Sequence, residues 1–378
     1  MSEKFNPNFN KNEQNSESKP ECNIYGKEKF PPETAKEYVE SLVANFKEHY
    51  SEIGYKEEPP VQISSGVDPT TRFIGSHISV FKPYLAENNI PNPGLFMRQD
   101  CLRTRNVNKL LDDNYTSSWG SYFTSIGAIT PPERLHEACD ETFDFFEKRL
   151  GIFSENILIR VSSTDVDLMN ACRQRYGENN LEIDSRNPEY YRHKIGMEGI
   201  SGRNFNIALR NVNEDGFDDI GNIILLEDAK KQLGVEIALG STTLLKQIHG
   251  LDHVQDCTPV IGLSSIENEA IKRKFEDAVI TSTVLYREGL RPFGQNNRNR
   301  ILKKYVRSLS YFRAKSGINI KSLAQIISDF EKKEFPELEG QTSDVIVEFV
   351  RSFENELFAK KNLTDDEKKI KGSLELLK

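Results

Sequence analysis

The sequence predicts an α+β domain followed by an all-helical region, and two observations support this. Between Gln62 and about Val254, short runs rich in β-branched residues alternate with amphipathic helical segments. From Glu267 onward, apolar residues recur with the helical period almost to the end of the chain. With 378 residues, the chain is long enough to bury two such cores.

The N-terminal segment, residues 1 to about 33, is predicted to be a disordered tail. It is rich in Asn, Lys, Glu, Ser and Pro and lacks apolar periodicity, so burial cannot offset the entropy of ordering it. Thr34 and Glu37 form a capping-box pattern that marks the start of the first helix. The apolar residues of that helix share one face: Tyr38, Leu42, Val43, Phe46 and Tyr50.

The middle of the chain carries the predicted strands. Residues 157–161 (Ile-Leu-Ile-Arg-Val) and 223–226 (Ile-Ile-Leu-Leu) have strand composition. Residues 135–150 have a helical pattern that ends at Gly151. We therefore expect residues 34–256 to form one α+β domain.

Residues 257–378 are predicted to form the helical domain. One helix in it ends at Gly317, and another lies closer to the C-terminus. The apolar positions are Ile301, Leu302, Tyr305, Val306, Leu309 and Phe312 in the first helix and Ile346, Phe349, Val350, Phe353 and Leu357 in the second.

Composition excludes several classes of protein. The chain has no apolar stretch long enough to span a membrane and no secretion signal, which predicts a soluble cytoplasmic protein. The net charge of −8 argues against a uniformly cationic nucleic-acid binder. The five cysteines, at positions 22, 101, 139, 172 and 257, are scattered without a CxxC pair, which predicts reduced thiols and no Cys-type zinc site.

His249, His253 and Cys257 have the spacing i, i+4, i+8. Three such residues on one straight helix are too far apart to hold a single ion, and no fourth ligand is evident. We expect core or surface roles for them and no metal site.

Several blocks of residues match the motifs of one enzyme family in order and spacing. Asp68-Pro69-Thr70 lies in a serine-rich segment that precedes Phe81-Lys82, and a Gln-x-Cys-x-Arg run ends at Arg103. Tyr122-Phe123 follows about twenty residues later, and residues 217–223 and 235–240 come next. Together these blocks resemble the signature blocks of the alanyl-tRNA synthetases, which are class II aminoacyl-tRNA synthetases.

A fourth block, Arg291-Pro292 with residues 297–304, extends the resemblance, which then runs from about residue 34 to the end. The resemblance implies the class II fold, an antiparallel sheet flanked by helices. It also implies a helical domain that in this family meets the tRNA acceptor stem. The family's editing and C-terminal domains have no counterpart, so we expect a short paralogue that does not edit.

The resemblance implies an ATP site with Mg²⁺. Arg103 matches the second-motif arginine that would contact the α-phosphate, and a guanidinium can bind two phosphate oxygens at once. Phe123 would stack on the adenine, and Gly240 matches a third-motif glycine at the ATP site. Without the resemblance, Arg103 reads as a surface arginine and Phe123 as a core aromatic.

The resemblance also implies an amino-acid site. Asn222 matches the family's strand asparagine, and Glu236 stands where the family has an aspartate that binds the ammonium group. His193 and Ala238 occupy pocket-wall positions with altered side chains, so the substrate need not be alanine. The alternatives are an acid on a solvated strand for Glu236 and an exposed histidine for His193.

Several departures put efficient ATP chemistry in doubt. The third-motif arginine that contacts the γ-phosphate is replaced by Thr243, which is short and neutral. Loss of such a cation removes several kcal/mol of transition-state stabilisation in comparable sites. Asn206 and Thr124 replace acids that would organise ATP and its magnesium. Arg203 is a candidate for a compensating positive charge.

Residues 298–315 contain seven basic residues and no acidic one. A solvated helix face is the usual reason for such a run. Here the absence of acids within the run favours contacts to phosphates, which the resemblance assigns to tRNA. The predicted contact residues are Arg298, Arg300, Lys303, Lys304 and Arg307.

The leading hypothesis is therefore a ligase that activates an amino acid as its adenylate and transfers it to tRNA or another acceptor. The alternative is a catalytically impaired relative that binds tRNA or acts as an accessory or regulatory protein. A third possibility is an enzyme that activates a small molecule and never meets RNA. The amino acid, the acceptor and the oligomeric state are left open by the sequence.

Overall fold

The computed structural model describes residues 29–185, 187–213, 215–260 and 265–377. Residues 1–28 of the predicted tail, with Cys22, lie outside the described residues. Phe30 belongs to the rest of that predicted tail, but it is buried and stacks on Tyr38 with the ring centroids 4.2 Å apart. The chain thus packs against the first helix before the predicted start of the folded part.

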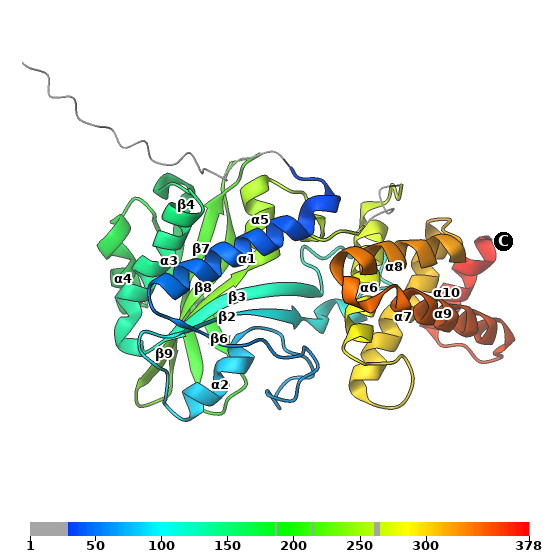
Figure 1. Cartoon of the computed structure of the whole chain (residues 1–378), viewed down its shortest axis with the longest axis horizontal. Coiled ribbons are helices and arrows are strands. Elements are labelled where there is room, and N and C mark those ends of the chain that lie inside the picture. Colours follow the sequence, from blue (N-terminus) through cyan, green and yellow to red (C-terminus); the bar gives the residue numbers. More distant parts are fainter. Residues whose placement is uncertain (1–28, 186, 214, 261–264, 378) are drawn as a thin grey trace, which may run out of the picture.

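Within the described residues, nine strands form one mixed sheet (Figure 1). Every pairing from β2 through β3, β9, β8 and β7 to β4 is antiparallel, whereas β1 and β5 add parallel pairs at the two edges. β6 pairs with β7 outside this path. The bounds are β1 Lys56–Glu57, β2 Leu95–Leu102, β3 Tyr122–Thr130, β4 Ile157–Ser162, β5 Leu181–Asp184, β6 Arg192–Lys194, β7 Ser201–Arg210, β8 Phe217–Glu227 and β9 Gln232–Gly240.

Helices cover one face of the sheet and only part of the other. The helices α1 (Ala35–Glu52), α3 (Leu135–Asp144), α4 (Val166–Tyr176) and α5 (Ser241–His249) share one apolar core with alternate residues of the strands. The opposite face is covered at one end by α2 (Ile78–Ala86), which packs on a smaller apolar cluster. The remainder of that second face carries polar and small side chains.

Most predicted elements are confirmed, with two corrections at helix ends. The strands predicted at 157–161 and 223–226 lie in β4 and β8. The helix predicted from residue 135 continues past α3 as a π-helical turn, Phe145–Arg149, and Gly151 follows with a φ of +64°. The capping box was a wrong prediction, because the Thr34 hydroxyl donates backwards to the Pro31 carbonyl at 3.0 Å.

The C-terminal part of the chain is helical, which confirms the predicted α+β fold with a helical continuation. Its apolar residues, including those predicted in α7 and α9, form a second core that also contains Leu102, Leu110 and Tyr122 from the preceding part of the chain. No helix in the described part of the chain is both long and apolar enough to cross a bilayer. The helices are α6 Glu269–Arg287, α7 Asn297–Lys315, α8 Ile320–Glu334, α9 Gln341–Ala359 and α10 Asp365–Leu376.

A buried clamp joins the sheet to these helices at Ser121, next to the start of β3. Oδ1 of Asp277, on α6, accepts from the Ser121 amide at 2.6 Å, and Oδ2 accepts from the Ser121 hydroxyl at 2.6 Å. The Tyr305 hydroxyl, on α7, lies 2.7 Å from the same serine oxygen. Burial raises the pKa of Asp277 to about 6.

Candidate functional site

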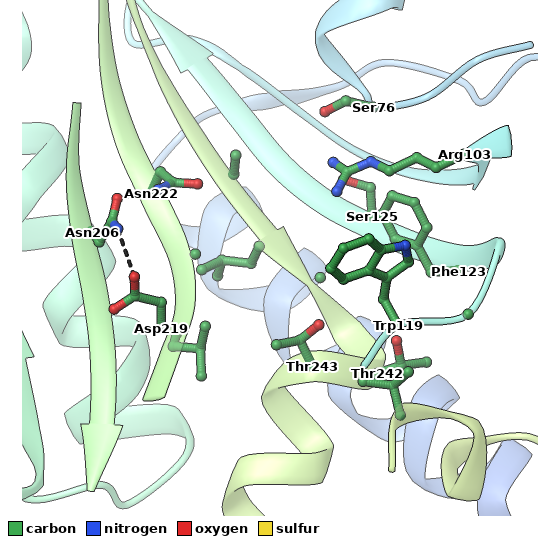
Figure 2. A pocket seen from close by; sticks show the side chains of 17 residues that line it. Ser76, Arg103, Trp119, Phe123, Ser125, Asn206, Asp219, Asn222, Thr242 and Thr243 are labelled. Atoms are coloured by element: carbon green, nitrogen blue, oxygen red, sulfur yellow. Dashed lines mark hydrogen bonds between the residues drawn. The ribbon is translucent and has the colours of Figure 1, made fainter. Parts of the chain in front are cut away.

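A cavity of about 260 Å³ lies on the face of the sheet that the helices leave uncovered (Figure 2). Its walls come from β3, β7, β8 and β9, from the loop between β2 and β3, and from the start of α5. The lining residues are Ser76, Arg103, Trp119, Gly120, Phe123, Ser125, Asn206, Asp219, Ile220, Gly221, Asn222, Ala238, Leu239, Gly240, Thr242, Thr243 and Val254.

The register of the sheet brings the cavity-facing residues together. Ser125 lies opposite Gly240, Ala238 lies opposite Asn222, and Asn222 lies opposite Asn206. These residues alternate along their strands with apolar residues that point into the helix-covered core. Asn206, Asn222 and Ala238 therefore form a row across three strands, and the Ser125–Gly240 pair lies two residues further along on the same face.

A β-bulge at Ile220 directs the carboxylate of Asp219 towards this cavity. Ile207 pairs with Gly221 and the next residue, Ala208, pairs with Asp219, so Ile220 is an extra residue in β8. Regular alternation would place Asp219 on the packed face with Ile223. The bulge instead buries Ile220 in the core and directs Asp219 to the open face.

Hydrogen bonds fix the asparagines of the cavity wall. Asn206 Oδ1 accepts from Asn222 Nδ2 and from Asn204 Nδ2, each at 2.6 Å. Asn206 Nδ2 donates to Asp219 Oδ2 at 2.6 Å, and Arg160 binds the other carboxylate oxygen at 2.7 Å. The side chain of Asn222 is therefore held in one orientation, with its carbonyl oxygen left to accept from a ligand.

Arg103 and Phe123 form the opposite wall. The Arg103 guanidinium carbon lies 4.7 Å from the centre of the Phe123 ring, and Nε donates to the Gly75 carbonyl at 3.1 Å. Figure 2 shows the guanidinium pointing into the cavity. Its two terminal nitrogens face the space where an anionic ligand would lie.

Several lining residues were not predicted from the sequence, among them Ser76, Trp119, Ser125 and Asp219. Trp119 is the single tryptophan of the chain and lies in the loop that joins two motif strands. It is 41% exposed, which is unusual for so large an apolar side chain, and its position in that loop was a signal that could have identified it. Asp219 had no comparable signal, because the bulge cannot be read from the sequence.

Two predicted substrate residues, Glu236 and His193, are not among the lining residues. Glu236 is 2% exposed, and its Oε1 lies 3.2 Å from Nε2 of the buried His77. His193 lies on β6, and burial lowers the pKa of its imidazole. Their predicted contacts with an amino acid therefore stay predictions.

Arg203 does not line the cavity, although it was a candidate for a compensating charge. Its guanidinium is bound by the carboxylates of Asp165, Asp167 and Glu227 at 2.7–3.2 Å. The Thr124 hydroxyl, at another position where the family has an acid, donates to Asp100 at 2.9 Å. Thr243, in contrast, lies in the cavity wall at the first turn of α5.

The predicted basic contact residues all lie on α7, but acids of other elements reach some of them. Arg300 and Lys304 are exposed. Arg298 donates to the carbonyls of Arg72 and Ser65. Arg307 stacks on the Phe353 ring and lies 4.0 Å from Glu367 of α10, and burial lowers the pKa of Lys303. The basic surface is therefore narrower than the sequence indicated.

His249, His253 and Cys257 do not share a helix, because α5 ends at His249 and Gly250 takes a left-handed conformation. The His253 ring bonds the Ser117 carbonyl, and the Cys257 thiol donates to the Thr242 carbonyl. Across the described ranges, no group of three or more His, Cys, Asp or Glu side chains is placed to hold a metal ion.

No protein-family model matches the chain, and no curated protein matches its sequence. Solved structures that resemble it are class II aminoacyl-tRNA synthetases. One is the aspartyl-tRNA synthetase of Entamoeba histolytica, with a TM-score of 0.36 and 9% identity, where the match covers 60% of this chain and 57% of that one.

Two others are threonyl-tRNA synthetase structures. The RNA-binding domain of the Cryptosporidium parvum enzyme matches with a TM-score of 0.40 and 11% identity over 59% of this chain and 67% of that chain. The putative enzyme ThrRS-1 of Aeropyrum pernix matches with a TM-score of 0.40 and 12% identity over 66% and 69%. At identities and scores this low, the likeness carries no conclusion about what this chain binds or does.

Proposed function

We propose that this protein is an alanyl-tRNA synthetase-like ligase that activates an amino acid with ATP as an aminoacyl adenylate and transfers it to tRNA in the cytoplasm. One observation carries the proposal. Arg103, Phe123, Asn222, Ala238 and Gly240, assigned to the site from the order of sequence motifs, line a single cavity although they span four separate segments.

The cavity fits the chemistry of adenylate formation in most respects. The amino-acid carboxylate attacks the α-phosphorus, so negative charge grows on the phosphate oxygens, and the Arg103 guanidinium is placed to stabilise it. Phe123 and Trp119 offer faces for the adenine. Asn222 and Asp219 supply polar contacts to the amino acid, and Asp219 is better placed for the ammonium group than Glu236, which faces His77.

The residues fit Mg²⁺ less well than they fit ATP. Magnesium prefers carboxylate and water oxygens, and Asp219 is the single carboxylate among the described residues that line the cavity. Asn206 and Thr124 stand where the family has acids.

Exchange of labelled pyrophosphate into ATP tests the proposal, because adenylate formation needs no tRNA. The purified full-length protein would be assayed against all twenty amino acids and a few analogues. Exchange with one amino acid supports the ligase and names its substrate. No exchange with any of them, from protein shown to be folded, favours the alternative of a tRNA-binding or accessory protein.

The Thr243→Arg substitution separates the ligase from the impaired relative. It restores a cation at the position where the family has its γ-phosphate arginine, in the wall of the cavity. For a relative that has lost activity, we expect ATP consumption to rise from background. For an active ligase with a different phosphate arrangement, we expect less than about a threefold change. Thr116→Arg, at an exposed position that does not line the cavity, is the control for added charge alone.

Trp119 gives a direct measure of ATP binding, because it is the single tryptophan and lines the cavity. We expect ATP to change its fluorescence saturably. Because Arg103 would bind a phosphate, Arg103→Ala should raise the apparent Kd by about tenfold or more. Trp119→Phe should abolish the fluorescence signal. The ATP affinity of this variant, measured by calorimetry, should stay within a few-fold of the wild-type value. A wild-type titration without any fluorescence change would place ATP away from this loop.

The exposed basic residues of α7 test the tRNA part of the proposal. Replacing Arg300 and Lys304 with alanine should weaken tRNA binding and lower the slope of log K against log salt by about 2, one for each lost phosphate contact. Lys321→Ala with Lys332→Ala on α8 is the matched control. An unchanged salt slope together with unchanged ligase activity would instead support an enzyme that activates a small molecule without RNA.

A further inference from the structure

Three buried side chains from separate segments form a chain of contacts at the wall of the cavity. His77 immediately precedes α2, Ser125 is in β3 and Glu236 is in β9. His77 Nδ1 lies 2.8 Å from the Ser125 hydroxyl. Its Nε2, which makes no hydrogen bond within the described structure, faces Glu236 Oε1 at 3.2 Å. The order hydroxyl, imidazole, carboxylate is that of a nucleophile, its base and the group that orients the base.

The sheet is built to hold this imidazole. A Cβ at Gly127 would lie 2.2 Å from His77 Cε1 and Nε2, so only glycine leaves room for the ring. Gly127 stands two residues after Ser125, on the same face of β3, and opposite Ala238 of β9. The ring therefore lies across two strands, with the serine on one side and the glutamate on the other.

Only the serine reaches the cavity. All three side chains are buried, at 3% exposed for Ser125, 0% for His77 and 2% for Glu236, but Ser125 alone of the three is among the residues that line the cavity. Arg103 also lines the cavity, and it is anchored on the Gly75 carbonyl, two residues before His77. A cation is thus available for the negative charge that develops when a hydroxyl attacks a carbonyl.

We propose that Ser125 is a nucleophile that accepts an acyl group from a carboxylic acid derivative with an anionic leaving group. Its Oγ bonds to the carbonyl carbon, its proton passes to His77 Nδ1, and the bond from carbon to the leaving-group oxygen breaks. Water or an acceptor hydroxyl then attacks the acyl-serine and loses its proton to solvent, the bond from the carbonyl carbon to Oγ breaks, and the His77 proton returns to Oγ. If the aminoacyl adenylate is the acyl donor, this step rests on the proposed function. The reactivity of Ser125 towards other acyl donors does not depend on that function.

A fluorophosphonate probe, which bonds to activated serines, tests this without ATP or an amino acid. We expect an adduct on the peptide that contains Ser125, located by tandem mass spectrometry in the wild-type protein. Labelling should be lost in Ser125→Ala, fall at least about 100-fold in His77→Gln, and fall less in Glu236→Gln. Ser352→Ala is the matched control, since Ser352 is an exposed serine of α9 outside the cavity, and the variant should label normally.

Two outcomes overturn the proposal: no adduct on Ser125 in folded wild-type protein, or equal labelling in folded His77→Gln. Release of p-nitrophenol from p-nitrophenyl acetate is a second test. The wild-type protein should show an initial burst of product, and the Ser125→Ala variant should not. The result is separable from the ligase question. Labelling without pyrophosphate exchange would support Ser125 as a nucleophile and contradict the ligase. Exchange without labelling would support the ligase and contradict Ser125 as a nucleophile.

Discussion

Arg103→Ala is expected to reduce amino-acid-dependent exchange of pyrophosphate into ATP by about 100-fold or more. Arg103 is the arginine that lines the cavity, and Thr243 stands where a second one is expected. Removing one preorganised donor from a developing oxyanion typically costs about 100-fold to 1,000-fold in rate. Because Arg103 is the single arginine among the described residues that line the cavity, the loss of rate should lie towards the upper end of this range.

The control is Arg105→Ala, which removes an exposed arginine two residues along that does not line the cavity. It should leave the exchange rate within about twofold. Arg103→Lys keeps the charge but loses the planar fork, so an intermediate rate is expected. Full activity in Arg103→Ala would mean that the α-phosphate is bound elsewhere.

Asp277→Ala should lower the free energy of unfolding by about 3 kcal/mol. The substitution leaves the Ser121 amide buried without an acceptor and removes the carboxylate that orders the Ser121 and Tyr305 hydroxyls. Urea denaturation followed by circular dichroism measures the change. The exposed Asp344 on α9 is the control, and Asp344→Ala should change stability by less than about 0.5 kcal/mol. A loss for Asp277→Ala no larger than that of the control would contradict an energetic role for the clamp.

The same carboxyl makes stability depend on pH. Its pKa is raised by burial to about 6 in the folded protein, above its ordinary value of 3.8, so the folded state holds the proton more tightly than the unfolded chain. The part of the stability that comes from proton binding at Asp277 is therefore fully present below about pH 4 and is lost as pH rises to about 6, while the hydrogen bonds from Ser121 persist above it. The difference in unfolding free energy between wild type and Asp277→Asn should change across that window and stay constant above it.

Much of the fold was predictable because the apolar residues that recur with a strand or helix period are the ones that the folded protein buries. The strands in β4 and β8 and the helices α7 and α9 carry apolar residues at the right period, and tertiary packing did not override them. The Thr34 capping box failed because the Pro31 carbonyl competes for the hydroxyl at close range.

The site was predictable only in part. Arg103, Phe123 and Asn222 were grouped by motif order, which does not depend on side-chain direction, and they line one cavity. Asp219 was missed because one bulged residue reverses the alternation of β8. The contact of Glu236 with His77 was also missed, because residues distant in sequence leave no trace in a linear pattern. Registers and long-range pairings decide such details, and neither is a property of a short window.

The clamp at Ser121 has a thermodynamic consequence. Ser121 follows Trp119 and Gly120 of the cavity wall. Its partner Tyr305 follows the exposed Lys304 on α7. A ligand that displaces α7 would act on the cavity loop through this clamp, and linkage would make that influence reciprocal. A cavity ligand that strengthens acceptor binding by some factor must itself be bound more tightly by the same factor when the acceptor is present.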